Sequence, residues 1–457
     1  MKPHQYLLIV SMMAATVASA ADPMPKKWID STAYVIPKKT ATDGEGYFSI
    51  IEGHNKRLYI GTHANAVNSW LVEFDPAAEK MRIAVDTHKA IGKDLKGFGS
   101  QAKIHTRNNT GKLTGRIYFG TKQGYPAKGE KREDYPGGYP MVYDPKTGKT
   151  KVYPIPVPHH GINSITPDES RGVAYISTCS DHRPGPGENA IFLILNLKTG
   201  KYRKLIDTEH YYGFIVVDYM GRAYHPLLGG DIARYDPRSG KLERLKQTID
   251  GTPPANATRL ALTDPHPDPI NWDISPDGKT LYAQPMSGNA LFAYDLTATG
   301  NTLPGRSLGA LIPGAKSTDC RAMCVGPSGS AWCAITEKSE GVSLLHLVRY
   351  RTGDKSPVDL GAVAVRNPDF TEFTGKDGKA LPFHGGFTKL KNGRTITRYA
   401  ILGVCESKDG NVNILALHPY SVLQVRAADI SATDSKAATQ SRSDVTTINQ
   451  RLRGARR

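Results

Sequence analysis

The chain has 457 residues, of which 39% are hydrophobic, a composition typical of one large globular body. Its 59 lysines and arginines outnumber its 43 acidic residues, which gives a formal net charge of +16. No stretch beyond the first twenty residues is long and apolar enough to span a membrane, and no nucleic-acid-binding motif is present, so we expect neither a membrane span nor a nucleic-acid partner. The excess of basic residues indicates an acidic polysaccharide as partner. The alternative is that it only keeps an exported protein soluble.

Both ends of the chain differ from its middle. Residues 1–20 combine a short polar start, an apolar run over 7–17 and a small-residue cleavage site at 18–20, which is the pattern of a secretory signal peptide. We therefore expect a secreted or periplasmic protein, and we expect a monomer. Residues 427–457 are rich in Ser, Thr, Ala and Arg with almost no aromatic side chains, so they are predicted to be a disordered basic tail.

Between these ends, one pattern recurs seven times: an apolar run, a tight turn, a second apolar run with a Tyr or Trp, and a third run closing on another turn. Each run has the length of a strand, and the period is roughly 50 to 60 residues, close to that of blade-type repeats. Residues 21–426 are therefore predicted to form an all-β, seven-bladed β-propeller around a central channel. The first turn of each repeat falls near His54, Thr110, Ser170, Met220, Asp277, Ser328 and Asp409.

The ends of the repeat array predict how the ring is sealed. The last repeat supplies only three strands, at 401–405, 412–417 and 421–426, whereas the β-rich segment 28–36 precedes the first repeat and has no partner of its own. An open ring would leave an exposed edge strand that invites aggregation. We expect 28–36 to be the outermost strand of the seventh blade.

The five cysteines cannot all pair in disulfides. When the sixth and seventh repeats are aligned on their turns, Cys324 and Cys405 occupy the same position of neighbouring innermost strands, and His384 lies in the turn that leads into the seventh blade. These three are ligands that a structural zinc ion takes, and the fourth would be His225, Cys320 or Asp218. The alternatives are two buried thiols, or a disulfide that joins Cys324 to Cys320 or to Cys405.

A second group of candidate residues surrounds the segment 101–107 (QAKIHTR), predicted to be an innermost strand beside the channel. Because alternate side chains of a strand face opposite sides, Lys103, His105 and Arg107 share one face. Three basic side chains in a row are unusual for a solvated strand. We expect neighbouring strand ends and turns to add more polar side chains at the same mouth of the channel: His63, Lys122, Tyr125, His160, His210, Tyr211 and Tyr212.

Such a mouth offers what β-elimination from a uronic acid requires. Cations neutralise the carboxylate so that the neighbouring proton becomes acidic, a histidine accepts that proton, and a tyrosine protonates the leaving oxygen. We assign His105 as the acceptor and Tyr211 or Tyr212 as the donor. The alternative is a set of hydrogen-bonded, channel-lining residues with no chemistry. The substrate-binding residues would be Lys103, Arg107 and Lys122, with His63, Tyr125, His160 and His210 on the rim.

The order of the motifs KIHT, IYFGT, GVAYIST and GFIVVD resembles secreted seven-bladed propeller polysaccharide lyases that cleave ulvan and rhamnose-glucuronate polymers. The resemblance implies catalysis shared by a His on the KIH-type strand, a second His, a Tyr and an Arg, together with a structural zinc ion. His105 matches the first His. Lys122 stands near the place of the second His, and Phe214 stands where an Arg is expected. These departures leave open a variant acid–base pair or a relative that has lost catalysis.

Two further functions stay open from the sequence. One is a non-catalytic propeller that binds glycan or protein at its basic mouth. The other is a metal-dependent hydrolase or lyase similar to propeller lactonases and streptogramin lyases, which would need acidic and amide side chains converging in the channel. The residues that could supply them are Glu52, Asn163, Asp218 and Asp273.

Overall fold

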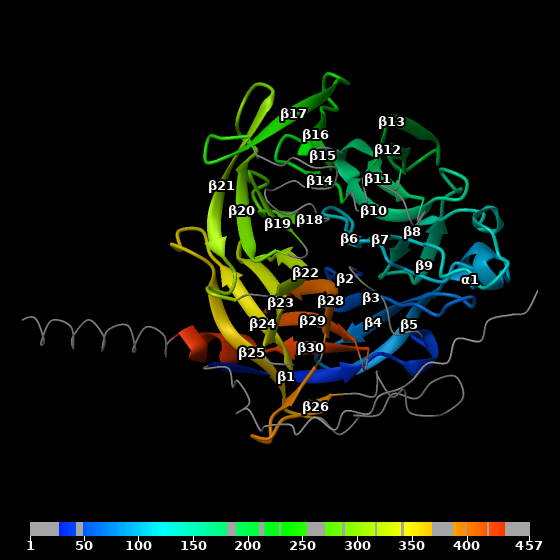
Figure 1. Cartoon of the computed structure of the whole chain (residues 1–457). Helices are drawn as coiled ribbons and strands as arrows, with labels where there is room; N and C mark the ends of the chain where they lie inside the picture. The colour runs from blue at the N-terminus through cyan, green and yellow to red at the C-terminus, as the bar shows by residue number, and fades with distance from the viewer. Residues whose placement is uncertain are drawn as a thin grey trace, which may run out of the picture.

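The structure is a computed structural model that describes residues 27–42, 49–180, 189–209, 214–227, 230–253, 270–285, 288–315, 318–339, 342–367, 387–397, 399–417 and 420–434. It is an all-β protein of propeller-like form, in which curled sheets surround a centre (Figure 1). The all-β, propeller-like part of the prediction is therefore confirmed. In the described part of the chain, no helix has both the length and the apolar character needed to cross a membrane.

Three separate sheets, each of four antiparallel strands, come first along the chain. The first contains β2 (Ile50–Glu52), β3 (Leu58–Gly61), β4 (Trp70–Asp75) and β5 (Lys80–Asp86). The second contains β6 (Asn109–Thr110), β7 (Ile117–Gly120), β8 (Pro140–Asp144) and β9 (Lys149–Val152). The third contains β10 (Gly161–Asp168), β11 (Val173–Cys179), β12 (Asn189–Asn196) and β13 (Tyr202–Glu209). The short helices are η1 (Lys38–Thr40), α1 (Thr87–Ile91), η2 (Gly97–Gly99), η3 (Arg132–Asp134) and η4 (Glu169–Arg171).

The later strands form two larger sheets, because outer strands of neighbouring units pair with each other. The eight-stranded sheet contains β14 (Val216–Val217), β15 (Ala223–Pro226), β16 (Ile232–Tyr235), β17 (Leu242–Ile249), β18 (Ile270–Ile274), β19 (Thr280–Pro285), β20 (Ala290–Asp295) and β21 (Thr302–Ala310). The ten-stranded sheet contains β1 (Trp28–Val35), β22 (Thr318–Val325), β23 (Ala331–Ser339), β24 (Val342–Tyr350), β25 (Val358–Val365), β26 (Thr388–Lys389), β27 (Thr395–Ile396), β28 (Tyr399–Glu406), β29 (Val412–Leu417) and β30 (Ser421–Val425).

A repeated turn motif sets the hairpin between the third and fourth strands of a repeat. In the Asp-Pro-Lys-Thr-Gly turn between β8 and β9, the carboxylate of Asp144 accepts a hydrogen bond from the amide of Lys146 at 2.9 Å. Gly148 then adopts a φ of 70°, which is strained for residues with a side chain. The corresponding Asp236 and Gly240 repeat this geometry, with an Asp236 contact of 2.8 Å and a φ of 70°. The motif therefore fixes the same hairpin in these two repeats.

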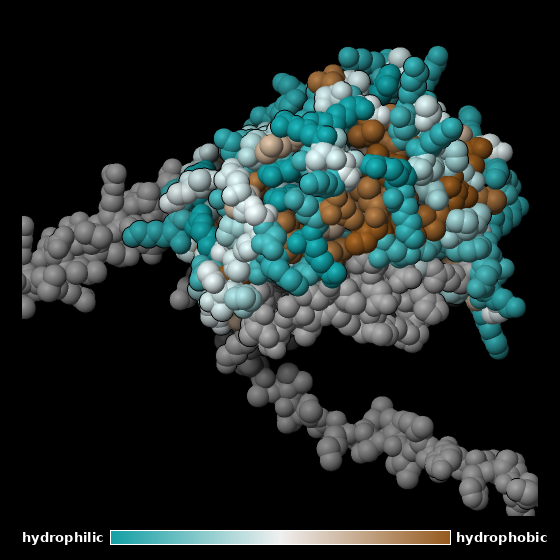
Figure 2. Space-filling model, turned by 90° about the horizontal axis from the view of Figure 1, so that it is seen from above, coloured by the Kyte–Doolittle hydropathy of each residue, from teal (hydrophilic) through white to brown (hydrophobic). Residues whose placement is uncertain are grey.

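The innermost strands make a circuit of contacts around the centre. Each lies beside the next along the chain, and β28 lies beside both β22 and β2. Figure 1 places these strands nearest the centre and the later strands of each sheet farther out. The view from above shows apolar side chains gathered toward the middle and hydrophilic ones around them (Figure 2). The members of the circuit are β2, β6, β10, β14, β18, β22 and β28.

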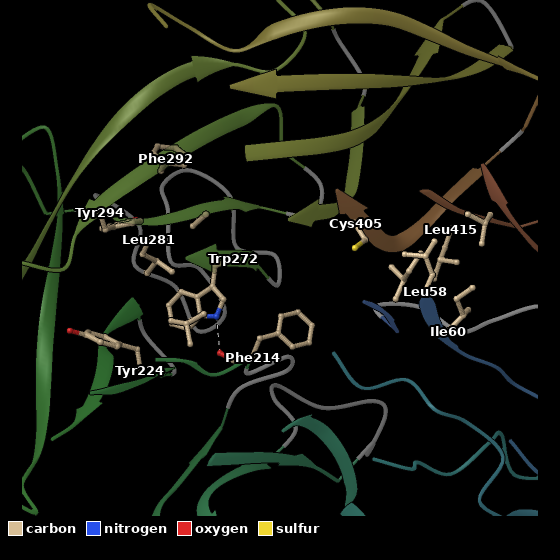
Figure 3. Packing of buried hydrophobic residues seen from close by; sticks show 14 of the residues in the cluster. Leu58, Ile60, Phe214, Tyr224, Trp272, Leu281, Phe292, Tyr294, Cys405 and Leu415 are labelled. Carbon is tan, nitrogen blue, oxygen red and sulfur yellow. Dashed lines mark hydrogen bonds between the residues drawn. The ribbon is translucent and has the colours of Figure 1, made fainter. Parts of the chain in front are cut away.

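The largest hydrophobic cluster in the described part of the chain takes residues from inner strands such as β14 and β18 and from outer strands such as β17 and β21 (Figure 3). Trp272 on β18 is almost fully buried in it, and its indole N–H donates to the carbonyl of Phe214 at 2.7 Å. Phe214 is itself buried in the same cluster. Position 214 therefore holds an apolar core residue in this chain, which accounts physically for the absence of the arginine that the resemblance implied.

The segment 28–36 forms β1 over Trp28–Val35, and this strand has two partners. Its first half pairs in parallel with β25, and its second half, Thr32–Val35, pairs antiparallel with Ser421–Gln424 of β30. Asn367 marks the crossover, because its side chain accepts from the Ala33 amide at 2.8 Å and donates to the Ala33 carbonyl at 2.9 Å. The N-terminal strand thus links the first and last parts of the chain.

The C-terminal segment departs from the prediction of a disordered tail beginning at residue 427. Residues 427–434 are helical, while 435–457 lie outside the described residues. The helix is held by ion pairs to the ten-stranded sheet: Asp434 binds both terminal nitrogens of Arg349 at 2.8 Å, and Asp429 binds Arg366 at 2.6 Å. Charge pairing orders a segment whose composition offers little apolar surface.

We expect Asp434→Ala to lower the free energy of unfolding by about 2 kcal/mol, because it leaves the buried guanidinium of Arg349 without its carboxylate. Burial raises the pKa of Asp434, but the hydrogen bonds and charges of Arg349 and Arg351 outweigh it and hold the pKa below its usual value. The contribution should therefore be complete above the unfolded-state pKa and be lost as pH falls through the folded-state pKa. Urea unfolding at neutral and acidic pH measures both effects.

Asp94→Ala is the matched control, because Asp94 pairs only with Lys96 and both side chains are 82% exposed. It should leave the unfolding free energy nearly unchanged. Equal loss in the two variants, or none at Asp434, would show that the helix does not stabilise the sheet.

Candidate functional site

The segment that carries the predicted catalytic histidine is not a regular strand. β6 begins only at Asn109, and residues 101–107 pair with their neighbours through single bridges. Lys103 makes antiparallel bridges with both His63 and Lys122. Its amide donates to the Lys122 carbonyl at 3.0 Å, and the Lys122 amide donates back at 2.8 Å. The segment is therefore inserted between the residues that follow β3 and β7.

This insertion brings four of the predicted substrate-binding residues together, and we call them, with the neighbouring His160, the basic cluster. The ammonium group of Lys103 lies 3.6 Å from the centre of the Tyr125 ring, a cation–π distance. The His63 ring lies 5.7 Å from the same ring. Lys103 and Lys122 are each only 3% exposed, so both cationic side chains are removed from bulk water. The members are His63, Lys103, Lys122, Tyr125 and His160.

His160 joins the cluster through the loop that enters β10. Its Nδ1 lies 3.0 Å from the hydroxyl of Thr178. The following Gly161 lies directly against Lys122, where an added Cβ would stand 2.5 Å from Cγ of the lysine. A side chain at position 161 would collide with the middle of the lysine side chain. The glycine of the HHGI motif therefore makes room for Lys122.

His105 lies on the same inserted segment and is 3% exposed. The next residue, Thr106, holds the backbone in place, because its hydroxyl donates to the Gly120 carbonyl at 2.6 Å and accepts from the Gly120 amide at 2.9 Å. These two bonds fix the backbone immediately after His105. The other predicted catalytic or rim residues, His210, Tyr211 and Tyr212, lie outside the described residues.

Arg107 does not join the basic cluster, in contrast to its predicted role as a carboxylate clamp. Its guanidinium forms an ion pair with Asp273 and donates to the carbonyl of Trp272, both on β18. Strand alternation fails here because residues 101–107 are held by isolated bridges rather than by a continuous ladder. The Arg107 side chain therefore binds β18 and not the basic cluster.

A support network behind the basic cluster was missed by sequence reasoning. The side-chain oxygen of Gln101 accepts hydrogen bonds from the hydroxyls of Thr121 at 2.5 Å and Tyr135 at 3.0 Å. The backbone N–H of Gln101 donates to Nε2 of His88 at 3.1 Å. Burial lowers the pKa of His88, which keeps the ring neutral and able to accept. Only the repeated Gly-Thr pair before His63 and Lys122 hinted at this arrangement, because the partners come from separate loops.

The predicted metal ligands do not form a complete site among the described residues. Cys324 and Cys405 line one cavity, but His384 lies outside the described residues, and no group of three or more His, Cys, Asp or Glu side chains in the described part could hold a metal ion. All five cysteines are free thiols, so neither proposed disulfide is present. Burial raises the pKa of Cys405 to about 12, which keeps its thiol protonated.

Each residue considered as the fourth zinc ligand has other contacts. The Nδ1–H of His225 donates to the Pro226 carbonyl at 2.7 Å, and Nε2 accepts from Ser177 at 2.8 Å. Burial lowers the pKa of this imidazole to about 4. Asp218 pairs with Arg222 at 2.6 Å and accepts from Tyr224 at 2.9 Å, so it also does not converge with Glu52 and Asp273 as a lactonase-like site requires. Cys320 is fully buried in a separate hydrophobic cluster.

Among the comparisons with known proteins, one solved structure supports the fold, and it supports the fold alone. No protein-family model matches the chain, and no curated protein matches it. A solved structure of U3-55K has a TM-score of 0.50 at 7% identity, over 87% of this chain and 98% of that one. A mitotic checkpoint complex structure gives 0.48 at 8% identity, over 93% and 98%. The extracellular domain of a hybrid two-component system from B. thetaiotaomicron gives 0.44 at 14% identity, over 87% of this chain and 41% of that one.

Proposed function

We propose that this chain is an exported seven-bladed propeller, sealed by β1, that cleaves an acidic polysaccharide by β-elimination at the basic cluster. The circuit of seven inner strands and the pairing of β1 with β30 support the ring. The observation that carries the activity is the pair of bridges that sets His63 and Lys122 on either side of Lys103, with Tyr125 over the Lys103 ammonium.

The chemistry follows from the groups in this cluster. Two ammonium groups removed from water interact strongly with a carboxylate, because the local dielectric constant is low. Neutralising the uronate carboxylate lowers the pKa of the proton on the adjacent carbon and stabilises the anion formed when that proton leaves. His105 accepts the proton, and a tyrosine of the 210–212 segment protonates the leaving oxygen. His63 supplies a second imidazole on the other side of Lys103 from Lys122, which stands near the place of the second histidine in the resembling lyases.

The direct test is the ultraviolet absorbance of an unsaturated uronate after incubation with ulvan, acidic gum or pectin fragments. An increase that stops in a Lys103→Met variant supports elimination at the basic cluster. Salt-sensitive binding without any absorbance change would instead favour a non-catalytic glycan-binding propeller. Absence of both binding and cleavage would place the function elsewhere on the molecule.

We expect Lys122→Met to weaken binding of an acidic oligosaccharide by about 10- to 100-fold, because a charge-assisted hydrogen bond contributes about 1.5–3 kcal/mol. Methionine keeps most of the side-chain length beside Gly161 and removes only the charge. Calorimetric titration at two salt concentrations measures the loss, and the wild-type affinity should fall with added salt. Lys112→Met is the matched control, since this lysine is exposed on a turn between β6 and β7. Equal affinities for both variants would remove Lys122 from the site.

A further inference from the structure

A second site lies at the centre of the ring, away from the basic cluster. A cavity of about 280 Å³ opens between inner strands β2, β18, β22 and β28, beside the turns that follow β22 and β28. Its volume lies just below the range of about 300–1,000 Å³ for small-molecule pockets, which fits a ligand of about one ring. Its wall combines charged, amide and apolar side chains.

Asn108 indicates that this cavity receives a polar ligand. It lines the cavity and is only 1% exposed, yet neither its side-chain oxygen nor its side-chain nitrogen has a hydrogen-bond partner among the described residues. A buried carboxamide left unsatisfied costs about 1–3 kcal/mol. The neighbouring Asn163, whose carbonyl accepts from the Arg107 amide at 3.3 Å, is also fully buried with both amide atoms unpartnered in the described part. Because buried polar groups in folded proteins nearly always have a partner, a polar ligand in the cavity would satisfy the Asn108 carboxamide.

The cavity wall carries more acidic than basic residues: Glu52, Asp273 and Glu406 against Arg107 and Lys408. The guanidinium of Arg107 is neutralised by Asp273. Glu52 and Glu406 add two carboxylates; Glu52 accepts only from the amide of Lys408, at 3.0 Å, in the contacts that the structure describes. Burial raises the pKa of Glu52 above its usual value, which shows the cost of holding this charge away from water. The wall therefore has acceptors for hydroxyl groups, and its small acidic excess favours a neutral ligand over a carboxylate.

We propose that the axial cavity binds a single neutral, hydroxyl-rich ring of the size of a monosaccharide. The Asn108 carboxamide both donates and accepts, as paired hydroxyl groups do, and the Glu52 carboxylate accepts from a further hydroxyl. Met323, Val325 and Val404 provide an apolar surface for the C–H face of the ring. This site and its ligand class differ from the acidic-glycan site, and the inference does not depend on that function.

The test uses D-glucose, D-galactose and D-xylose as probes, with D-glucuronate as the charged counterpart, in saturation-transfer NMR titrations of the mature chain. At least one neutral sugar should bind saturably and more tightly than D-glucuronate. Asn108→Leu keeps the side-chain shape and removes both polar atoms, so it should weaken that binding by about tenfold or more. Glu52→Gln should weaken it as well, while Lys122→Met should leave it unchanged.

Thermal unfolding of each ligand-free variant separates loss of the site from loss of the fold. Asn108→Leu should melt no lower than the wild type, because it removes an unsatisfied polar group. If this variant fails to fold, the Glu52→Gln titration decides the question alone. The proposal is overturned if none of the three neutral sugars binds, if they bind Asn108→Leu as tightly as the wild type, or if D-glucuronate binds at least as well.

Discussion

Replacement of His105 by Ala is expected to reduce turnover of an acidic glycan by about 10²- to 10⁴-fold, the usual contribution of a general base. Binding should change little, because the substitution leaves Lys103, Lys122 and Tyr125 in place. The expected pattern is therefore a lower kcat at nearly constant dissociation constant. Initial rates from the unsaturated-uronate absorbance, together with calorimetric binding, separate the two quantities.

His54→Ala is the matched control for this prediction. His54 is exposed in the turn between β2 and β3 and makes none of the bridges that form the basic cluster, so its loss should alter neither turnover nor binding. A His105→Ala variant that turns over like the wild type would remove His105 from the reaction. Parallel loss of turnover and binding would indicate a structural role, since His105 is buried on a segment held only by isolated bridges.

The repeat pattern predicted the hairpins and much of the basic cluster, because both depend on local sequence. The Asp144 and Asp236 turns recur with their glycines and set the same hairpin twice. The same periodicity places His63 and Lys122 at equivalent positions after the second strands of adjacent sheets. Once the repeats are aligned, the fold explains why His63 and Lys122 both pair with Lys103.

Arg107 and the C-terminal helix could not be predicted in this way, because their positions depend on partners far along the chain. Alternation along 101–107 places Arg107 beside His105, but the ion pair with Asp273 on β18 determines where its side chain lies. The composition of 427–434 indicates disorder, yet Arg349 and Arg366 bind its carboxylates. Neither contact leaves a signal in local hydrophobicity. The unsatisfied amide of Asn108 is likewise a property of packing alone.

The proposed closure of the ring rests on β1, which joins strands from opposite ends of the chain. Ile29 and Ala33 of this strand are buried in the hydrophobic cluster shared with β25 and β30. The hydroxyl of Ser31 donates to the Ala364 carbonyl at 2.9 Å. Removal of the strand exposes this apolar surface and the backbone edges of both partners, which favours edge-to-edge association.

Deletion of residues 27–36 from the mature chain is therefore expected to abolish cooperative unfolding near the wild-type temperature and to produce aggregates, measured by calorimetry and light scattering. Two substitutions on the same strand, one at a buried and one at an exposed position, test how much β1 contributes to the unfolding free energy. Ile29→Ala should lower the unfolding free energy by about 3 kcal/mol, because a buried aliphatic side chain is lost. Asp30→Ala should change it little, because the Asp30 side chain is 52% exposed and its partner Arg394 is also partly exposed. A monomeric deletion variant with an unchanged melting temperature would show that β1 does not seal the ring.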